Sequence, residues 1–450
     1  MSQITYPFRK NGKNMPSKVL LAIVIGTILE YFDFLLFAHF SLIITPLFFS
    51  ELDPIVASLQ GISLLSIGFL MRPIGAVIFG RIGDLKGRKP ALSFALLCMT
   101  LPTFVISFIP DYKTIGIMAP IILVLCRMIQ GISLGGEYTN AGVLLMELSS
   151  FKRRGFYSGI LCASASVGCI IALICSFIIL HFNVPQWTWR VPFFLASLLG
   201  FASYKLRIIL LESPEFIKLQ MHETFSKNFI PNKKVLENKI AFFITVSIGA
   251  LVGGLIWTSL TYTNFYLTRI LEWQATEAVF MTFLFLMVYI IATPLIGILG
   301  DYIGKAHLIM LWSAILATFI SYPLLFCLTH GYVIITQIGF GLLSSFFGAC
   351  THAIMVDLYP IHKRCQSISL GFSIGMGIGG ATPLIEIWLA DTTNDYITPA
   401  IYISALAVIG SIAVYLYPSN RKKEEDKIPQ VFNETIEKHE KKISKANLLR

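Results

Sequence analysis

The chain has 450 residues, of which 55% are hydrophobic and only 13% are charged, and its formal net charge is +10. A soluble protein of this size could not bury so much apolar surface, so most apolar side chains must face lipid or one another. The basic residues occur in short bursts between apolar runs and not on one solvated face, which argues against a nucleic-acid-binding protein.

Twelve apolar runs are long enough to cross a bilayer as helices, since a lipid-spanning helix needs roughly 20 apolar residues. In chain order they are 19–46, 57–80, 90–109, 115–145, 155–181, 190–210, 240–267, 275–300, 306–328, 331–356, 365–389 and 398–417. Spans 1, 4 and 7 are long enough to tilt or kink. The sequence therefore predicts an all-α membrane protein with two six-helix bundles.

The polar segments divide the chain into five parts. The predicted divisions are an amino-terminal segment 1–18, a first bundle 19–211, a basic linker 212–239, a second bundle 240–418 and a tail 419–450. The tail is dense in Lys and Glu and could form a solvated helix, but its apolar positions are too sparse for coiled-coil heptads. Eight cysteines occur singly, mostly within apolar runs, and indicate neither a disulfide framework nor a metal site.

Basic residues mark one side of the membrane. They gather before span 1 and in alternate loops, for example at Arg81 to Lys89, at Lys152 to Arg154 and in the linker, whereas the other loops contain little more than Lys113, Arg190 and Arg269. Because basic loops stay in the cytoplasm, both termini and the linker are expected there.

One loop pattern occurs in both halves of the chain. The loop after span 2 reads Gly80-Arg-Ile-Gly83-Asp84-Leu-Lys-Gly87-Arg88-Lys89, and the loop after span 8 reads Gly297-Ile-Leu-Gly300-Asp301-Tyr-Ile-Gly304-Lys305. A second similarity pairs Glu147 to Arg154 with Asp357 to Arg364. Two motifs in equivalent loops indicate duplicated bundles, which place a substrate path at the bundle interface.

The repeated loop has the residues that a gate would need. Glycines allow helix ends to approach closely, the acid can cap the amino end of a neighbouring helix, and the bases can pair with acids or lipid phosphates. The candidate cytoplasmic gate residues are Gly80, Asp84, Gly87, Arg88, Lys89, Asp301, Gly304 and Lys305. The alternative is a basic loop that only fixes the topology.

Charges inside spanning segments are costly and usually face a cavity or a partner. Six charged residues of the spans are expected at membrane depth: Glu30, Asp33, Arg72, Arg127, Glu137 and Glu386. Five of them belong to the first bundle, and Glu386 is expected near the outer interface. Arg127, Gln130 and Glu137 share one face of span 4, within an arc of about 80°.

The excess of acids over arginines in the first bundle suggests a proton carrier, because burial and a nearby arginine shift a carboxyl group in opposite directions. Glu30 or Asp33 is the expected carrier, and Glu137 is expected to hold Arg127 or Arg72. Arg127 could bind a substrate carboxylate through two parallel hydrogen bonds. Arg72, Gln130, Tyr262 and Gln337 are the further substrate-binding candidates. A static ion-pair network is the alternative.

These motifs also carry a family resemblance over roughly residues 18–418. The loop Gly80 to Lys89 resembles the cytoplasmic loop motif of the major facilitator superfamily. Gly26-Thr-Ile-Leu-Glu30-Tyr-Phe-Asp33-Phe and Arg127-Met-Ile-Gln130-Gly131-Ile-Ser-Leu-Gly135-Gly136-Glu137-Tyr138 resemble signatures of its metabolite:proton symporter family, as does Phe69-Leu-Met-Arg72-Pro73-Ile-Gly75. The likeness is greatest to proline/betaine symporters in the first half.

The resemblance implies proton symport of a carboxylate-bearing metabolite, either a zwitterionic osmolyte or an organic acid, in a bacterial inner membrane. An antiporter or passive facilitator of the same fold is the first alternative, and a membrane metabolite sensor is the second. The expected partners are a small molecule, protons and the lipid bilayer, with no nucleic acid, no metal and no cofactor; a monomer would suffice. Enzymatic activity is not expected, because no Walker loop, zinc spacing or nucleophile elbow occurs.

Overall fold

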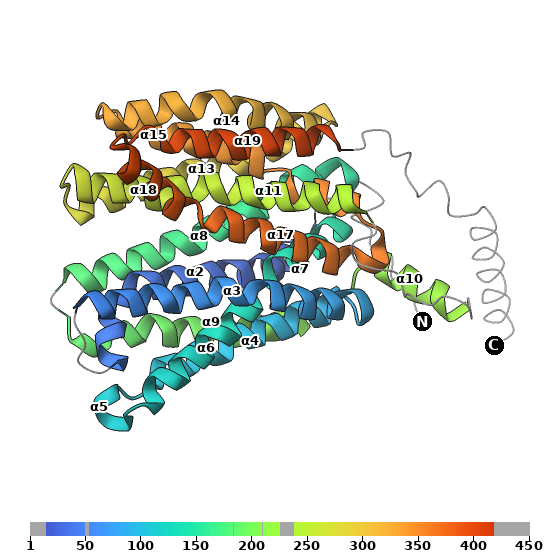
Figure 1. Cartoon of the computed structure of the whole chain (residues 1–450). Helices are drawn as coiled ribbons and strands as arrows, with labels where there is room; N and C mark the ends of the chain where they lie inside the picture. Colours follow the sequence, from blue (N-terminus) through green and yellow to red (C-terminus); the bar gives the residue numbers. More distant parts are fainter. Residues whose placement is uncertain (1–14, 50–53, 183, 209, 226–237, 418–450) are drawn as a thin grey trace, which may run out of the picture. The chain divides into compact units, whose positions relative to one another are not determined.

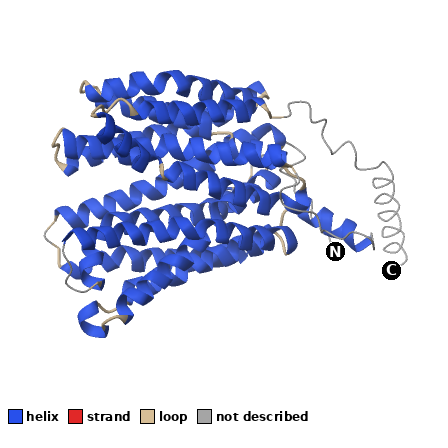
Figure 2. Ribbon diagram, viewed as in Figure 1, coloured by secondary structure: helices blue, strands red, loops and turns tan. Residues whose placement is uncertain are grey.

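The computed structural model describes residues 15–49, 54–182, 184–208, 210–225 and 238–417. Every regular element in these ranges is a helix (Figure 2). The amino-terminal bases Arg9, Lys10 and Lys13, the middle of the linker and the tail 419–450, including its predicted helix, lie outside the described residues.

The helices of the first half follow the first six predicted spans. Spans 1 to 3 are α2 (Ser17–Phe48), α3 (Pro54–Leu85) and α4 (Arg88–Phe108), followed by the short α5 (Tyr112–Ile115). Span 4 is α6 (Met118–Leu134) with α7 (Glu137–Leu148), and spans 5 and 6 are α8 (Arg154–His181) and α9 (Arg190–Ile208), preceded by η1 (Phe151–Arg153) and η2 (Gln186–Trp189). Helix α10 (Pro214–Phe225) lies in the linker.

The second half has the same order of spans. Span 7 is α11 (Lys239–Trp257), which continues as η3 (Thr258–Tyr262), α12 (Thr263–Phe265) and η4 (Tyr266–Ile270). Spans 8 to 10 are α13 (Ala275–Ile303), α14 (Ala306–Thr329) and the pair α15 (Val333–Gly348) and α16 (Thr351–Leu358). After η5 (Ile361–Lys363), span 11 is α17 (Arg364–Gly380) with α18 (Thr382–Thr393), and span 12 is α19 (Pro399–Tyr415).

Ten stretches of the described residues are long and apolar enough to cross a membrane. The 32-residue α3 and the shorter apolar α19 complete the twelve predicted spans. Helices α13, α14, α15 and α19 lie together on one side in Figure 1, and α2, α4, α6 and α9 lie together on the other.

Several spans are broken or distorted. Span 4 breaks at Gly135 and Gly136, and span 10 breaks at the equivalent place in the second half, at Ala349 and Cys350. A Cβ atom on Gly135 would overlap the backbone of α3 at Arg72, so this glycine lets α3 pack directly against the break. The two segments η3 and η4 are π-helical, a distortion that is frequent at functional sites.

Two helix pairs make the most extensive contacts between the bundles. Helix α3 packs against α17, and α8 packs against α13. At the second pair, a Cβ on either Gly155 or Gly297 would overlap the carbonyl oxygen of the other, so glycine permits backbone contact there. Within the first bundle, α2, α4, α6 and α9 enclose an aromatic cluster that includes Phe37, Phe40 and Phe193.

Candidate functional site

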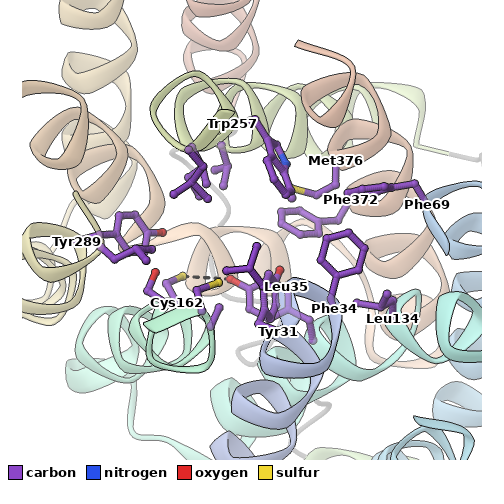
Figure 3. A pocket seen from close by; sticks show the side chains of 18 of the residues that line it. Tyr31, Phe34, Leu35, Phe69, Leu134, Cys162, Trp257, Tyr289, Phe372 and Met376 are labelled. Carbon is purple, nitrogen blue, oxygen red and sulfur yellow. Dashed lines mark hydrogen bonds between the residues drawn. The ribbon is translucent and has the colours of Figure 1, made fainter. Parts of the chain in front are cut away.

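An aromatic cavity lies between the two bundles (Figure 3). Its wall includes the rings of Phe34 on α2, Phe69 on α3 and Trp257 on α11. Their centroids are 5.0 Å apart for Phe34 and Phe69, 5.9 Å for Phe69 and Trp257, and 6.5 Å for Phe34 and Trp257, all edge to face. Helices from both bundles therefore contribute to one apolar chamber.

Arg72 is the one charged residue among the described residues that line this cavity. Its guanidinium carbon lies 5.8 Å from the Phe69 ring centroid, and its Nε atom has no hydrogen-bond partner in the described structure. The indole nitrogen of Trp257 is likewise buried without a partner. The cavity therefore offers a cation and an unused donor within aromatic walls.

The Arg127 side chain lies beside the cavity wall and does not line it. Its Nη1 atom donates to Gln130 Oε1 at 2.9 Å and lies 3.6 Å from Asp33 Oδ2. Asp33 also accepts hydrogen bonds from Gln130 Nε2 at 2.9 Å and from Thr103 Oγ1 at 2.8 Å. Arg127 stacks on Phe37, with its guanidinium carbon 4.1 Å from the ring centroid. Two residues of the predicted face of span 4, Arg127 and Gln130, thus hold Asp33 of span 1.

The prediction that Glu137 holds Arg127 or Arg72 was wrong. Glu137 forms a bidentate ion pair with Arg207 of α9, in which Nη1 donates to Oε2 at 2.8 Å and Nη2 donates to Oε1. Arg207 also donates to the carbonyl oxygen of Leu92 at 2.7 Å and is fully buried. Sequence reasoning missed Arg207 although it lies inside the predicted span 190–210, because its place near the end of the span suggests an interfacial residue.

Glu30 differs from both neighbouring acids. Its side chain is buried, and neither carboxyl oxygen has a hydrogen-bond partner in the described structure. It interacts electrostatically with Glu137, Arg72 and Arg207. Glu30 is therefore within electrostatic range of both the Glu137–Arg207 pair and the arginine of the cavity.

The candidates in the second bundle lie outside the cavity lining. Tyr262 donates its hydroxyl hydrogen to the carbonyl oxygen of Tyr396 at 2.7 Å, and Gln337 Nε2 donates to the carbonyl oxygen of Ser259 at 3.4 Å. His352 is buried against the Tyr138 ring at 4.8 Å between centroids. Glu386 is fully buried, because α18 turns it toward Thr258.

The acids of the repeated loop cap helices of the opposite bundle. Asp84 accepts hydrogen bonds from the backbone nitrogens of Cys365 and Gln366, both at 2.9 Å, at the start of α17. Asp301 accepts from the nitrogens of Gly155 and Phe156 at 2.7 and 2.8 Å, at the start of α8. The expectation that each acid caps a neighbouring helix is confirmed, and a carboxylate is stabilising at that position.

Residues of the second repeated motif form ion pairs between the two halves of the chain. Arg154 pairs with Asp357 at 2.8 Å, and Arg364 pairs with Glu147 at 2.7 Å. We call this end of the molecule, where the linker helix α10 also lies, the linker end (Figure 1). Glu215 of α10 contacts both arginines, 3.6 Å from Arg154 and 2.5 Å from Arg364.

The remaining loop residues support these contacts. Arg88 donates to both carboxyl oxygens of Glu147 at 3.0 and 3.1 Å. Lys89 Nζ donates to the carbonyl oxygen of Ile208 at 2.6 Å, and Lys305 is exposed before α14. Gly87 and Gly304 have φ angles of 109° and 68°, which an L-residue rarely adopts. A Cβ on Gly80 would press on the backbone of Gln366.

Comparisons with known proteins agree on a class. A family model described as sugar (and other) transporter matches residues 18–242, and one described as major facilitator superfamily matches residues 246–447. A proline/betaine transporter of Salmonella typhimurium is 30% identical over 410 residues, covering 88% of this chain and 82% of the relative. The inner membrane metabolite transport protein YhjE of Escherichia coli is 30% identical over 431 residues, covering 91% and 95%.

Solved structures share the fold. The proton:xylose symporter XylE aligns with a TM-score of 0.72 at 13% identity, over 89% of this chain and 96% of that chain. The human organic anion transporter MFSD10 aligns with a TM-score of 0.65 at 13% identity, over 89% and 100%.

Twelve spans around a cavity between two bundles define a multi-pass membrane transporter of the secondary type, and not an enzyme. The chain belongs to the major facilitator superfamily. The predicted fold class and family are thereby confirmed, as is the expectation of a small-molecule substrate and a lipid environment.

Proposed function

We propose that this transporter is a proton-coupled symporter of a zwitterionic osmolyte of the proline or betaine type. The supporting observation is the position of Arg72, which lines the cavity and also interacts electrostatically with Glu30. An ionised Glu30 and a substrate carboxylate compete for the same guanidinium. Protonation of Glu30 leaves Arg72 to the substrate, so proton and substrate bind cooperatively.

The cavity favours a zwitterion over an organic acid. Arg72 can bind one carboxylate through two parallel hydrogen bonds. The faces of Phe34, Phe69 and Trp257 suit an ammonium group, which aromatic rings attract. A di- or tricarboxylate would need more cations than the described lining provides. Relatives named as proline/betaine transporters support the same substrate class.

Glu30 is the proton carrier in this proposal. Asp33 pairs with Arg127 and accepts a hydrogen bond from Gln130, which suits an ionised acceptor, whereas Glu30 has no donor in the described structure. A buried carboxyl group that accepts no hydrogen bond is more stable in its protonated, neutral form. Arg127 then positions Asp33 within the first bundle and does not bind substrate directly.

The linker end is assigned to the cytoplasm in the same proposal, on the strength of the basic loops. The caps at Asp84 and Asp301 and the exchanged pairs hold this end closed, while the cavity receives substrate from the opposite end. Parallel repeats that rock about a central site move substrate in this way.

Reconstituted protein tests the proposal. Uptake of radiolabelled proline, betaine, oxoglutarate, citrate and shikimate is measured in proteoliposomes, with and without an inward proton gradient. We expect proline or betaine to accumulate only with the gradient, while the external medium becomes alkaline. Glu30→Gln should still exchange labelled for unlabelled substrate but lose accumulation, and the exposed control Glu272→Gln should behave as wild type. Uphill uptake by Glu30→Gln would remove Glu30 from the coupling, and accumulation without alkalinisation would indicate another driving ion.

A further inference from the structure

Glu386 is a second buried acid that the proposed mechanism does not use. It lies on α18, past the break in span 11 at Ala381 and therefore toward the end opposite the linker end. Its side chain is fully buried, and it does not line the aromatic cavity. It forms no ion pair within the described residues. The charged neighbours that surround Glu30 and Asp33 are thus missing here.

The distances between oxygen atoms around Glu386 bear on whether its carboxyl group is protonated. Thr258 Oγ1 is 2.7 Å from Glu386 Oε1 and 2.8 Å from the carbonyl oxygen of Gly254. A hydroxyl group has one hydrogen and can donate to only one of these oxygens. If Glu386 is ionised, one of the two close contacts joins two oxygens with no hydrogen between them.

A protonated Glu386 satisfies both contacts. Its own O–H then donates to Thr258 Oγ1, and the Thr258 hydroxyl donates to the carbonyl oxygen of Gly254. The second carboxyl oxygen, Oε2, is buried and has no partner in the described structure. An ionised carboxylate would leave that oxygen as an uncompensated buried charge, which is strongly unfavourable.

The neighbouring elements offer no counter-charge. The titratable groups that interact with Glu386 are two tyrosines, Tyr262 of η3 and Tyr402 of α19. Tyr262 itself interacts with Tyr266, Asp395 and Tyr396, none of which carries a positive charge. No Lys, Arg or His of the described chain faces Glu386 closely enough to form an ion pair or an electrostatic interaction with it.

We propose that Glu386 is a second proton-binding site, placed in the second bundle, and that it holds its proton in the conformation described here. The site is independent of Glu30 and of the identity of the substrate. Its hydrogen bond ties α18 to the first residue of the π-helical segment η3, so it joins spans 7 and 11 at their irregular halves. Loss of the proton requires water to reach Glu386, which couples deprotonation to separation of these two spans.

Infrared difference spectroscopy of the reconstituted protein tests this site directly, because a protonated carboxyl group has a C=O stretch that a carboxylate lacks. Spectra are recorded between neutral and alkaline pH for wild type, Glu386→Gln, Glu30→Gln and the exposed control Glu272→Gln. We expect wild type to show a protonated-carboxyl band that is absent in Glu386→Gln and present in the other two variants. Since Glu30→Gln removes a different band, failure of the proposed coupling residue is distinguishable from failure of this site.

Thr258→Val gives a second measurement that does not alter the acid. Without the threonine hydroxyl, the Glu386 band should remain but move to the higher frequency of a carboxyl group that donates no hydrogen bond. A Glu386→Gln spectrum that keeps every protonated-carboxyl band of wild type would overturn the proposal. A Thr258→Val spectrum with an unmoved band would do so as well.

Discussion

Glu137 and Arg207 lie within the lipid-spanning part of the molecule, where a charge without a partner is costly. The sequence places Glu137 on the same face of span 4 as Arg127, and this suggested a partner on a neighbouring turn or on span 2. The folded chain instead supplies Arg207 from span 6, which also bonds backbone oxygens of spans 1 and 3 at Ala22 and Leu92. A single guanidinium thus fixes four spans of the first bundle.

Arg72 is the residue for which the structure predicts the clearest effect on binding. Arg72→Ala should weaken betaine binding to purified protein by more than tenfold, or about 1.4 kcal/mol, because the carboxylate loses its guanidinium partner. Choline has the same quaternary ammonium group and no carboxylate, so its binding should stay unchanged. Isothermal titration of both ligands measures this, with the exposed Arg269→Ala as the control. Equal losses for betaine and choline would show that the substitution disturbs the cavity as a whole.

At the scale of a single element, span 11 shows what a row of glycines does. Gly371, Gly375 and Gly379 recur at four-residue intervals, a spacing that can serve either sliding or close packing of helices. In the structure Cβ atoms on Gly375 and Gly379 would overlap the backbone of α11, whereas nothing lies within 4 Å of a Cβ on Gly377. The row therefore packs α17 against α11 within the second bundle.

This difference gives a matched pair of substitutions on one helix. Gly375→Ala should lower the free energy of unfolding by about 1–3 kcal/mol, because the added methyl group must displace the α11 backbone. Gly377→Ala should leave stability unchanged or raise it slightly, since alanine favours the helix. Thermal unfolding in detergent, followed by intrinsic fluorescence, compares the two. The packing assignment fails if both variants unfold at the same temperature.

At the linker end, the two halves of the molecule are held together by contacts between the repeated motifs. Each half supplies residues that bind the other half. Asp84 of the first half caps α17, and Asp301 of the second half caps α8. The pairs Arg154–Asp357 and Arg364–Glu147 cross between the halves in the same manner. Because each contact joins the two bundles, none can persist when the linker end opens.

Asp84→Asn should therefore favour the state in which the linker end is open, by about 1–2 kcal/mol, since a carboxylate at a helix amino terminus is lost. The measurement uses a cysteine-free background with Ser369→Cys, a buried residue whose hydroxyl lies 2.6 Å from that of Thr139 across the bundles. A membrane-impermeant thiol reagent applied from the cytoplasmic side should react several-fold faster in Asp84→Asn than in the parent.

The exposed control Asp391→Asn should not change that rate. A faster thiol reaction from the extracellular side alone would contradict the assignment of the linker end to the cytoplasm. An unchanged reaction rate would mean that Asp84 does not stabilise the closed linker end.

Much of the architecture could be predicted because lipid imposes strict local rules. Each span must satisfy its own backbone hydrogen bonds and must be long and apolar enough to cross the bilayer, and both requirements are visible in a linear sequence. The acid of the repeated loop was also predictable as a helix cap, since a carboxylate beside flexible glycines is stabilising near the amino terminus of a helix. Partner choice was less predictable: Glu137 pairs with Arg207 and not with Arg127 or Arg72, and nothing in the sequence indicated the contact of Glu386 with Thr258.

What the sequence alone determined is thus the number of spans, their duplication and the capping chemistry of Asp84 and Asp301, because these depend on composition and local spacing. Three features depend on the folded arrangement: which charges meet, that Arg72 and not Arg127 lines the cavity, and that Glu386 is enclosed with Thr258. The physical reason is that burial and pairing depend on how helices rotate and cross, which side chains from several distant spans determine together.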